Sequence, residues 1–234
     1  EYVVRQYDHE VQGGSVIKPL VGANNDGPSD AAVIRPLLDS CEGVAVANGI
    51  SPSYSDIDTY HMAACAIDEA IRNIVAVGGS LNQIALNDNF CWPSPLFDPE
   101  KNRDGKYKLA QLVRANKALY DYTTAFNTPC ISGKDSMSID YKYKDEKGVE
   151  HKISGPPTLL ITAIGKIEDV RKAVTMDVKA AGDSVYILGM TRPELGGSEY
   201  YAKLGYTGNS VPRVDARSAK RLYNALSKAI ELEL

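Results

Sequence analysis

The stretch from Tyr60 to Gly79 constrains the fold most, because it is long, largely apolar and ends in a glycine pair. Its apolar residues recur at helical spacing, which predicts a mostly buried helix with a glycine C-terminal exit. Glu69 and Asn73 are four residues apart and therefore share one helical face. Burying a carboxylate and an amide without partners is costly. The pair therefore either forms local hydrogen bonds or holds a hard cation through oxygen ligands.

Composition excludes several classes of function. The chain has 234 residues, of which 44% are hydrophobic and 24% charged, as in an ordinary globular protein. Its net charge of -4 gives no basic surface for nucleic acid, and no apolar run is long enough to span a membrane. The four cysteines lack CxxC spacing, which argues against a zinc site or a disulfide framework. We therefore expect a cytoplasmic protein.

Alternating helix and strand patterns follow one another along the chain. A second amphipathic helix is predicted at residues 109–126, and a terminal helix after Asp215. Charged and aromatic residues alternate at 141–150, which indicates a hairpin or a solvated excursion. Apolar runs bounded by turn residues predict the strands, which we place at 15–20, 29–36, 43–48, 83–86, 128–131, 156–165 and 183–189.

Two polar segments that follow predicted strands are candidate sites. Residues 87–89, Asn-Asp-Asn, come after the strand at 83–86 and form either a ligand site at a strand end or a loop closed by side-chain hydrogen bonds. Residues 132–138, SGKDSMS, follow the strand at 128–131. Gly133 would let the backbone approach a phosphate closely, while Lys134 and the serines offer donors. The Walker pattern is absent, so this phosphate signal is weak alone.

Six motifs in a fixed order resemble one enzyme family over essentially the whole chain. The sequence resembles the phosphoribosylformylglycinamidine synthase family, within the AIR synthase-like superfamily of selenophosphate synthetase and thiamine monophosphate kinase. The motifs are RQYDHEVQG (5–13), SDAAVIRP (29–36), DEAIRNIV (68–75), DNFCWPSP (88–95), SGKDSMS (132–138) and LGGSEYY (195–201).

The resemblance implies an α/β (α+β) fold, with a mainly antiparallel sheet backed by two long helices and the start of a second α/β domain. We expect an incoming segment at 1–22, an N-terminal-type domain at 23–167 and a truncated C-terminal-type domain at 168–234. The chain begins without methionine and its last helix has no stop signal. We therefore expect a fragment, from the second repeat of a larger synthetase.

The family's reaction uses ATP to activate the amide oxygen of formylglycinamide ribonucleotide, which glutamine-derived ammonia then displaces to give the amidine. The resemblance thus implies Mg²⁺ and ATP or ADP as cofactors. It implies as partners the remaining synthetase domains and a glutaminase domain or subunit, and an open sheet edge would allow a homodimer. The fragment alone is expected to be inactive.

The resemblance also implies roles for individual residues. Asp30, Glu69 and Asn73 match magnesium ligands of long-chain members, with Ser29 beside the nucleotide. In short-chain members the glycine-loop positions contact ATP, magnesium and substrate, and here they are Gly133, Lys134 and Ser136. Lys134 is a departure, because an ammonium cannot ligate magnesium, although it can contact phosphate.

Three alternatives stay open on sequence alone. The nucleotide-contacting Asp of short-chain members aligns with Leu86, and Asp88 is its candidate replacement. The site at Asp30, Glu69 and Asn73 is either part of a working ligase or an auxiliary ADP site in a non-catalytic scaffold. A cousin enzyme of the superfamily would need a glycine-rich loop with cysteine or lysine near residue 20, and the sequence has none.

Overall fold

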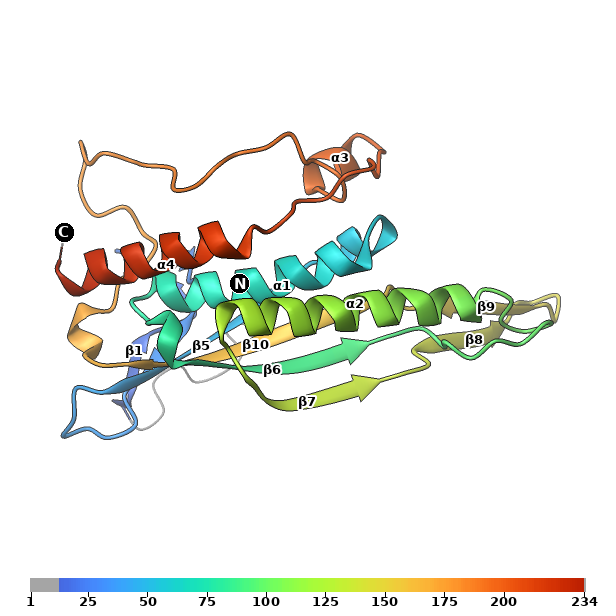
Figure 1. Ribbon diagram of the computed structural model, residues 1–234, viewed down its shortest axis with the longest axis horizontal. Helices are drawn as coiled ribbons and strands as arrows, with labels where there is room; N and C mark the ends of the chain where they lie inside the picture. Colours follow the sequence, from blue (N-terminus) through green and yellow to red (C-terminus); the bar gives the residue numbers. More distant parts are fainter. Residues whose placement is uncertain (1–12, 234) are drawn as a thin grey trace.

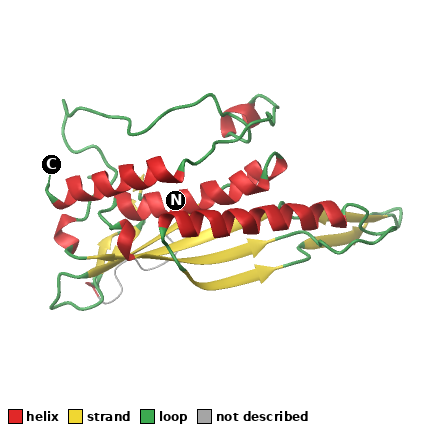
Figure 2. Ribbon diagram, in the orientation of Figure 1, coloured by secondary structure: helices red, strands yellow, loops and turns green. Residues whose placement is uncertain are grey.

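A single sheet covered by helices on one face organises the structure, a computed structural model that describes residues 13–233 (Figures 1 and 2). The six strands lie in the order β1-β4-β5-β10-β6-β7, and every neighbouring pair is antiparallel except β6 and β7, which run parallel. The strands of this sheet are β1 (Ser15–Ile17), β4 (Ala32–Ile34), β5 (Gly43–Ile50), β10 (Thr158–Ile167), β6 (Ile84–Cys91) and β7 (Cys130–Ser136).

The helices α1 (Thr59–Ala76) and α2 (Gly105–Phe126) form the layer above the sheet (Figure 1). Asp58 caps α1 by accepting hydrogen bonds from the backbone N–H groups of Tyr60 and His61. The left-handed Asn127 ends α2. Short elements complete the chain, namely η3 (Pro52–Asp56), η4 (Leu81–Gln83), η5 (Val170–Lys172), α3 (Glu199–Lys203), and the small pairs β2 (Leu20–Val21) with β3 (Gly27–Pro28) and β8 (Asp140–Lys144) with β9 (Glu150–Ser154).

Strict alternation along the central strands places the core between the sheet and the helices. In β10, Leu159, Ile161 and Ala163 are fully buried beneath the helices, while their neighbours in the strand point to the opposite face. Gly49 of β5 lies so close to α1 that a Cβ atom there would meet the carbonyl oxygen of Ala66. Glycine is therefore required where helix and sheet approach most closely.

A third long helix, α4 (Ala216–Glu231), packs against both α1 and α2 (Figure 1). Its Tyr223 is buried, stacks on Phe126 of α2, and donates a hydrogen bond to Asp68 of α1 at 2.6 Å. Arg72 bonds to both the Asp68 carboxylate and the Tyr223 hydroxyl. The C-terminal part of the chain thus contributes a helix to the same core as the sheet.

The α/β fold, the mainly antiparallel sheet and the two backing helices are as the sequence predicts. Both long helices, the buried strand at 156–165, the hairpin near 141–150 and the helix after Asp215 are present. The motif at 5–13 lies almost entirely outside the described residues. Within residues 13–233 no helix is long and apolar enough to cross a membrane. The domain boundary near 168 stays a prediction.

Three local predictions were wrong. Residues 87–89 do not follow a strand but lie inside β6, and residues 132–136 belong to β7 rather than to a loop. The polar residues of β6 pair with β10, and those of β7 pair with β6, so both strands continue through them. The segment 183–189 forms no strand, and its Val185 and Ile187 are 85% and 84% exposed. A strand exists only where a neighbour satisfies its backbone, and this run has none among the described residues.

Candidate functional site

Two of the three predicted magnesium ligands, Glu69 and Asn73, bond the last residues of β5. Glu69 Oε2 accepts a hydrogen bond from the backbone N–H of Ile50 at 2.8 Å, and Asn73 Nδ2 donates one to the carbonyl of Asn48 at 3.1 Å. Strand β4 pairs with β5 only as far as Val46, so these side chains bond backbone groups beyond the end of that pairing. Asp30 lies two residues before the start of β4, at this same end of the pairing.

Among the described residues, the hydrogen bonds leave oxygen atoms unused at all three positions. Glu69 keeps Oε1 and Asn73 keeps Oδ1, because each residue bonds β5 through its other polar atom. Among the described residues the Asp30 carboxylate has no hydrogen-bond or ion-pair partner, and Ser29 Oγ donates to the carbonyl of Ala31. Two carboxylates and an amide oxygen are a donor set that suits a hard cation such as Mg²⁺.

Those residues do not form an all-acid cluster. Within residues 13–233 no group of three or more His, Cys, Asp or Glu side chains is arranged to hold a metal ion. Two acids and an amide would leave part of the coordination shell of Mg²⁺ to water or to the phosphates of a nucleotide, which is its usual manner of binding. The residues present therefore fit a nucleotide-bound Mg²⁺ better than an isolated ion.

The second candidate environment lies where β6 and β7 run side by side. Asp88 pairs in register with Gly133, and a Cβ atom at Gly133 would lie 2.6 Å from Asp88 Oδ1. Glycine at this position therefore gives the carboxylate its space. Burial raises the pKa of the Asp88 carboxyl, and the negative charge of Asp135 adds to this rise, while the Cys130 thiol hydrogen-bonds to it.

Lys134 and Ser136 lie on the other face of the sheet from Asp88. They pair with Asn89 and Cys91, whose side chains alternate with the helix-facing Asp88 and Phe90. Among the described residues neither the Lys134 ammonium nor the Ser136 hydroxyl forms a hydrogen bond. The structure thus brings Asp88 beside Gly133 but divides the four residues between two faces.

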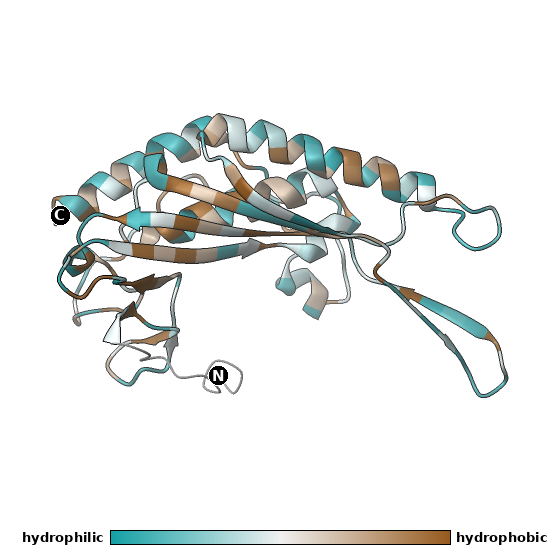
Figure 3. Ribbon diagram, turned by 90° about the horizontal axis from the view of Figure 1, so that it is seen from below, coloured by the Kyte–Doolittle hydropathy of each residue, from teal (hydrophilic) through white to brown (hydrophobic). Residues whose placement is uncertain are grey.

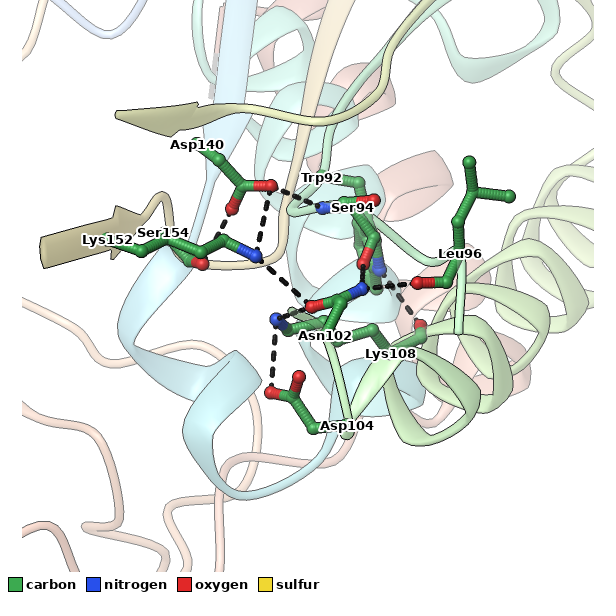
Figure 4. Close-up of polar contacts among 9 residues, drawn as sticks. All are labelled: Trp92, Ser94, Leu96, Asn102, Asp104, Lys108, Asp140, Lys152 and Ser154. Atoms are coloured by element: carbon green, nitrogen blue, oxygen red, sulfur yellow. Dashed lines mark hydrogen bonds and ion pairs between the residues drawn. The ribbon is translucent and has the colours of Figure 1, made fainter. Parts of the chain in front are cut away.

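The sequence does not predict the polar network that Figure 4 shows. Its residue Trp92 is hydrogen-bonded to the backbone of Ser136. The backbone N–H of Trp92 donates to the carbonyl of Ser136 at 2.9 Å, and its indole Nε1 donates to the carbonyl of Lys108 at 3.0 Å. Nearby, Asn102 accepts from both Lys108 and Lys152. The motif at 88–95 contains Trp92, but its partners lie on α2 and on the hairpin, and no sequence period links them.

A family model matches the part of the chain that contains the six-stranded sheet and both backing helices. Residues 1–166 match the model described as the FGAR-AT PurM_N-like domain. The chain belongs to this family. The FGAR-AT PurM_N-like match contains all eight predicted site residues, from Ser29 to Ser136.

Curated relatives extend the similarity to the full chain. The phosphoribosylformylglycinamidine synthase subunit PurL of Thermococcus sibiricus is 34% identical over 233 residues, which is 100% of this chain and 28% of that protein. The subunit PurL of Thermoplasma acidophilum is 30% identical over 233 residues, or 99% of this chain and again 28% of the relative. The chain therefore spans little more than a quarter of the length of these relatives.

Solved structures show the same fold at lower identity. T. maritima PurL complexed with FGAR aligns with a TM-score of 0.53 at 19% identity, covering 99% of this chain and 29% of that one. T. maritima PurL complexed with AMPPCP aligns with a TM-score of 0.51 at 22% identity, covering 74% and 24%. At such identities the likeness shows the fold alone.

Proposed function

We propose that this chain is part of a phosphoribosylformylglycinamidine synthase, the ligase that converts formylglycinamide ribonucleotide, glutamine-derived ammonia and ATP to the amidine. The observation that carries this proposal is the full-length similarity to relatives named subunit PurL. Solved structures of the same fold are complexed with FGAR and with AMPPCP, which supports a ribonucleotide substrate and a nucleotide. The chain contributes nucleotide and substrate contacts to that larger enzyme.

A nucleotide-bound Mg²⁺ would be held by Asp30, Glu69 and Asn73, with Ser29 beside the nucleotide. Support comes from the unused oxygen atoms of these residues at the end of β5. Mg²⁺ in such a site neutralises phosphate charge. Glu69 and Asn73 are oriented in advance, because their bonds to Ile50 and Asn48 fix the side chains before any ligand binds.

The face of the sheet that carries Lys134 and Ser136 would meet the substrate. The Lys134 ammonium suits a phosphate oxygen as a point charge, and the Ser136 hydroxyl can donate to or accept from a ribonucleotide. Asp88 and Gly133 lie on the helix-covered face, where a nucleotide contact would need the edge of β7. We therefore assign the substrate contact to Ser136 and keep Gly133 and Asp88 as nucleotide candidates. The sequence predicts a nucleotide contact for Lys134, and we reassign it to the substrate because it shares the face of Ser136.

The uncovered face of the sheet is the surface for the rest of the synthetase. Seen from below, its strands alternate between apolar and polar residues (Figure 3). Ile34, Val46, Ile50 and Ile164 are each at least 36% exposed there. Contiguous exposed apolar side chains on a sheet mark an interface. We propose that the remaining synthetase domains cover this face. When they are absent, a second copy of the chain pairs there. A glutaminase delivers the ammonia, and the reaction takes place in the cytoplasm.

A non-catalytic scaffold with an auxiliary ADP site is the second candidate. It is favoured by the hydrogen bonds of Glu69 and Asn73, which serve the fold whether or not a nucleotide is bound. Titration of the chain with ADP and MgCl₂, followed by calorimetry, tests the site common to both functions. We expect saturable binding that requires Mg²⁺, and a folded chain that binds no ADP would contradict the nucleotide site.

Complementation separates the two candidates. Supplying the missing synthetase domains and glutaminase should restore amidine formation from formylglycinamide ribonucleotide, and Ser136→Ala should reduce it. If Ser136→Ala and Lys134→Met leave the restored activity unchanged while ADP still binds, the scaffold function is favoured.

A further inference from the structure

The buried residue Asn102 is the centre of a polar network at the base of the β8–β9 hairpin (Figure 4). Its Oδ1 accepts hydrogen bonds from Lys108 Nζ and Lys152 Nζ, both at 3.1 Å. Its Nδ2 donates to the carbonyls of Ser94 and Leu96. The side chain therefore uses both acceptor positions and both donor hydrogens, the full capacity of an amide, while only 8% of the residue is exposed. We call this set the Asn102 network; its residues are Ser94, Leu96, Asn102, Asp104, Lys108, Asp140, Lys152 and Ser154.

Charges in the Asn102 network balance. Lys108 pairs with Asp104 at 3.0 Å, and Lys152 pairs with Asp140 at 3.4 Å. Asp140 also accepts from Ser154 Oγ and from the backbone N–H of Ser94. Burial alone would raise the pKa of Asp140, but these hydrogen bonds and Lys152 hold it below its ordinary value. A network whose members are all satisfied has no capacity left for a ligand, and its effect is to make its surroundings rigid.

The segments that the network joins are far apart in the sequence. Figure 4 shows side chains from the residues after β6, from the loop before α2, from α2 itself and from both hairpin strands converging on Asn102. The hairpin projects away from the body of the molecule (Figure 3). It has its own two-stranded sheet and shares no ladder with the large one. Its orientation is therefore fixed at the base, where Asp140, Lys152 and Ser154 lie.

Ser136 is held between the network and β6. The backbone N–H of Trp92 donates to the Ser136 carbonyl at 2.9 Å, and the Trp92 carbonyl accepts from the N–H of Ile139 at 3.0 Å. Asp140, the next residue, belongs to the network. Trp92 is fully buried and its indole is bonded to α2. The segment from Ser136 to Asp140 therefore has fixed attachments at both ends, although the Ser136 hydroxyl itself bonds no described residue.

We propose that Asn102 and Lys152 are positioning residues for the substrate contact of Ser136. They hold the base of the hairpin, and through Asp140 and Trp92 they fix the backbone from which the Ser136 hydroxyl and the Lys134 ammonium reach the ribonucleotide. The inference rests on the proposed function, because it requires that Ser136 contacts substrate. Neither positioning residue touches the substrate or the reacting atoms.

The test uses the complete synthetase with this chain in place. Asn102→Ala and Lys152→Met each break the network, whereas Lys152→Arg keeps the cation and should restore it. Displacing a substrate contact weakens substrate binding, so the KM for formylglycinamide ribonucleotide should rise by about tenfold or more in the first two variants. The kcat and the KM for ATP should stay within about threefold of their original values. Lys152→Arg should return the substrate KM to near its original value.

The hairpin provides a matched control. Lys142 lies opposite Lys152 in the β8–β9 ladder, is exposed, and bonds no other described residue through its side chain. Lys142→Met should therefore leave all kinetic constants unchanged. In the complete synthetase, hydrogen exchange of the Ile139 amide reports whether the attachment is loosened, and exchange of the other amides of this chain reports whether each variant is folded.

Three outcomes contradict the inference in distinguishable ways. If the Ile139 amide exchanges faster in Asn102→Ala but the substrate KM does not change, the network does not position the contact. If kcat and all KM values change together and Lys152→Arg does not restore them, the network is merely structural. If Ser136→Ala itself leaves the substrate KM unchanged, the substrate contact fails, and the proposed role of Ser136 fails with it.

Discussion

Helix α1 carries two polar pairs of identical spacing that the structure uses in opposite ways. Asp68 and Arg72 face α4, and Glu69 and Asn73 face the end of β5. Asp68 is 3% exposed and both of its oxygen atoms are bonded, one to Tyr223 and one to Arg72. Glu69 is exposed and has one oxygen bonded to a backbone N–H.

The comparison teaches how to distinguish a polar group that holds the fold from one that is available to a ligand. Spacing does not distinguish them, since both pairs are four residues apart on one helix. The discriminating quantity is the bonding capacity that remains after folding. Asp68 has little left, because it joins two helices across 155 positions of sequence. Within residues 13–233, Glu69, Asn73 and Asp30 retain oxygen atoms without a hydrogen bond, which a cation can use.

The largest effect is expected at the Asp68–Arg72 pair, because both oxygen atoms of Asp68 are hydrogen-bonded. Asp68→Ala leaves the buried Tyr223 hydroxyl without its acceptor and removes the link between α1 and α4, so the free energy of unfolding should fall by about 2 to 3 kcal/mol. Glu69→Ala removes one hydrogen bond at an exposed position and should cost about 1 kcal/mol or less. Urea denaturation of both variants measures the difference. Equal losses in the free energy of unfolding would show that the number of hydrogen bonds made does not distinguish the two pairs.

How far the sequence could predict this molecule follows from the range of each interaction. Helical period and strand length depend on neighbouring residues, which is why α1, α2, β10 and the hairpin were predicted from local pattern. The polar residues of the SGKDS segment predict a loop, because the strand they form exists only through its pairing with β6. The segment 183–189 shows the reverse, an apolar strand pattern without a partner among the described residues.

The candidate site divides in the same way. The Glu69–Asn73 pair could be recognised from spacing alone. The structure shows its hydrogen bonds, and its binding of a cation stays a prediction. The partners in β5 could not be predicted, because they depend on where β4 stops pairing with β5. The Asn102 network was missed for the same reason, since its members come from segments joined only in three dimensions.

The second largest effect is expected at Asp30, the predicted cation ligand that lies two residues before β4. Asp30→Ala should weaken Mg²⁺-dependent ADP binding by about tenfold, or about 1.4 kcal/mol, because it removes a charged oxygen ligand. The free energy of unfolding should change by less than about 0.5 kcal/mol, since the carboxylate has no partner among the described residues. Calorimetric titration and urea denaturation of the same variant measure both quantities.

A nearby aspartate gives the control for this variant. Asp26 is exposed in the turn before β3, and Asp26→Ala should alter neither ADP binding nor stability. Unchanged binding in Asp30→Ala would contradict the assignment of spare oxygens to a cation. A large loss of stability would instead show that Asp30, like Asp68, is a polar residue that holds the fold.

The smallest effect sharpens the comparison at an intermediate case, the N-cap of α1. Asp58 accepts backbone hydrogen bonds from Tyr60 and His61 and two more from Arg114, at 2.8 Å each, yet its side chain remains 26% exposed. It is therefore saturated without being deeply buried. Asp58→Asn keeps an oxygen for the cap but loses the charge that faces Arg114, which should cost about 0.5 to 1 kcal/mol at pH 7.

The pH dependence of that difference identifies its origin. Burial alone would raise the pKa of Asp58, but the hydrogen bonds from Arg114 and from the His61 backbone hold it below its ordinary value of 3.8. A lowered carboxyl pKa stabilises the fold above the unfolded pKa, and this stabilisation is lost as the pH falls through the folded value. The gap between the original chain and Asp58→Asn should therefore begin to close as the pH falls below about 4. A gap that does not narrow as the pH falls below about 4 would attribute the effect to shape rather than to charge, and a fully used hydrogen-bonding capacity would then stabilise only groups as deeply buried as Asp68.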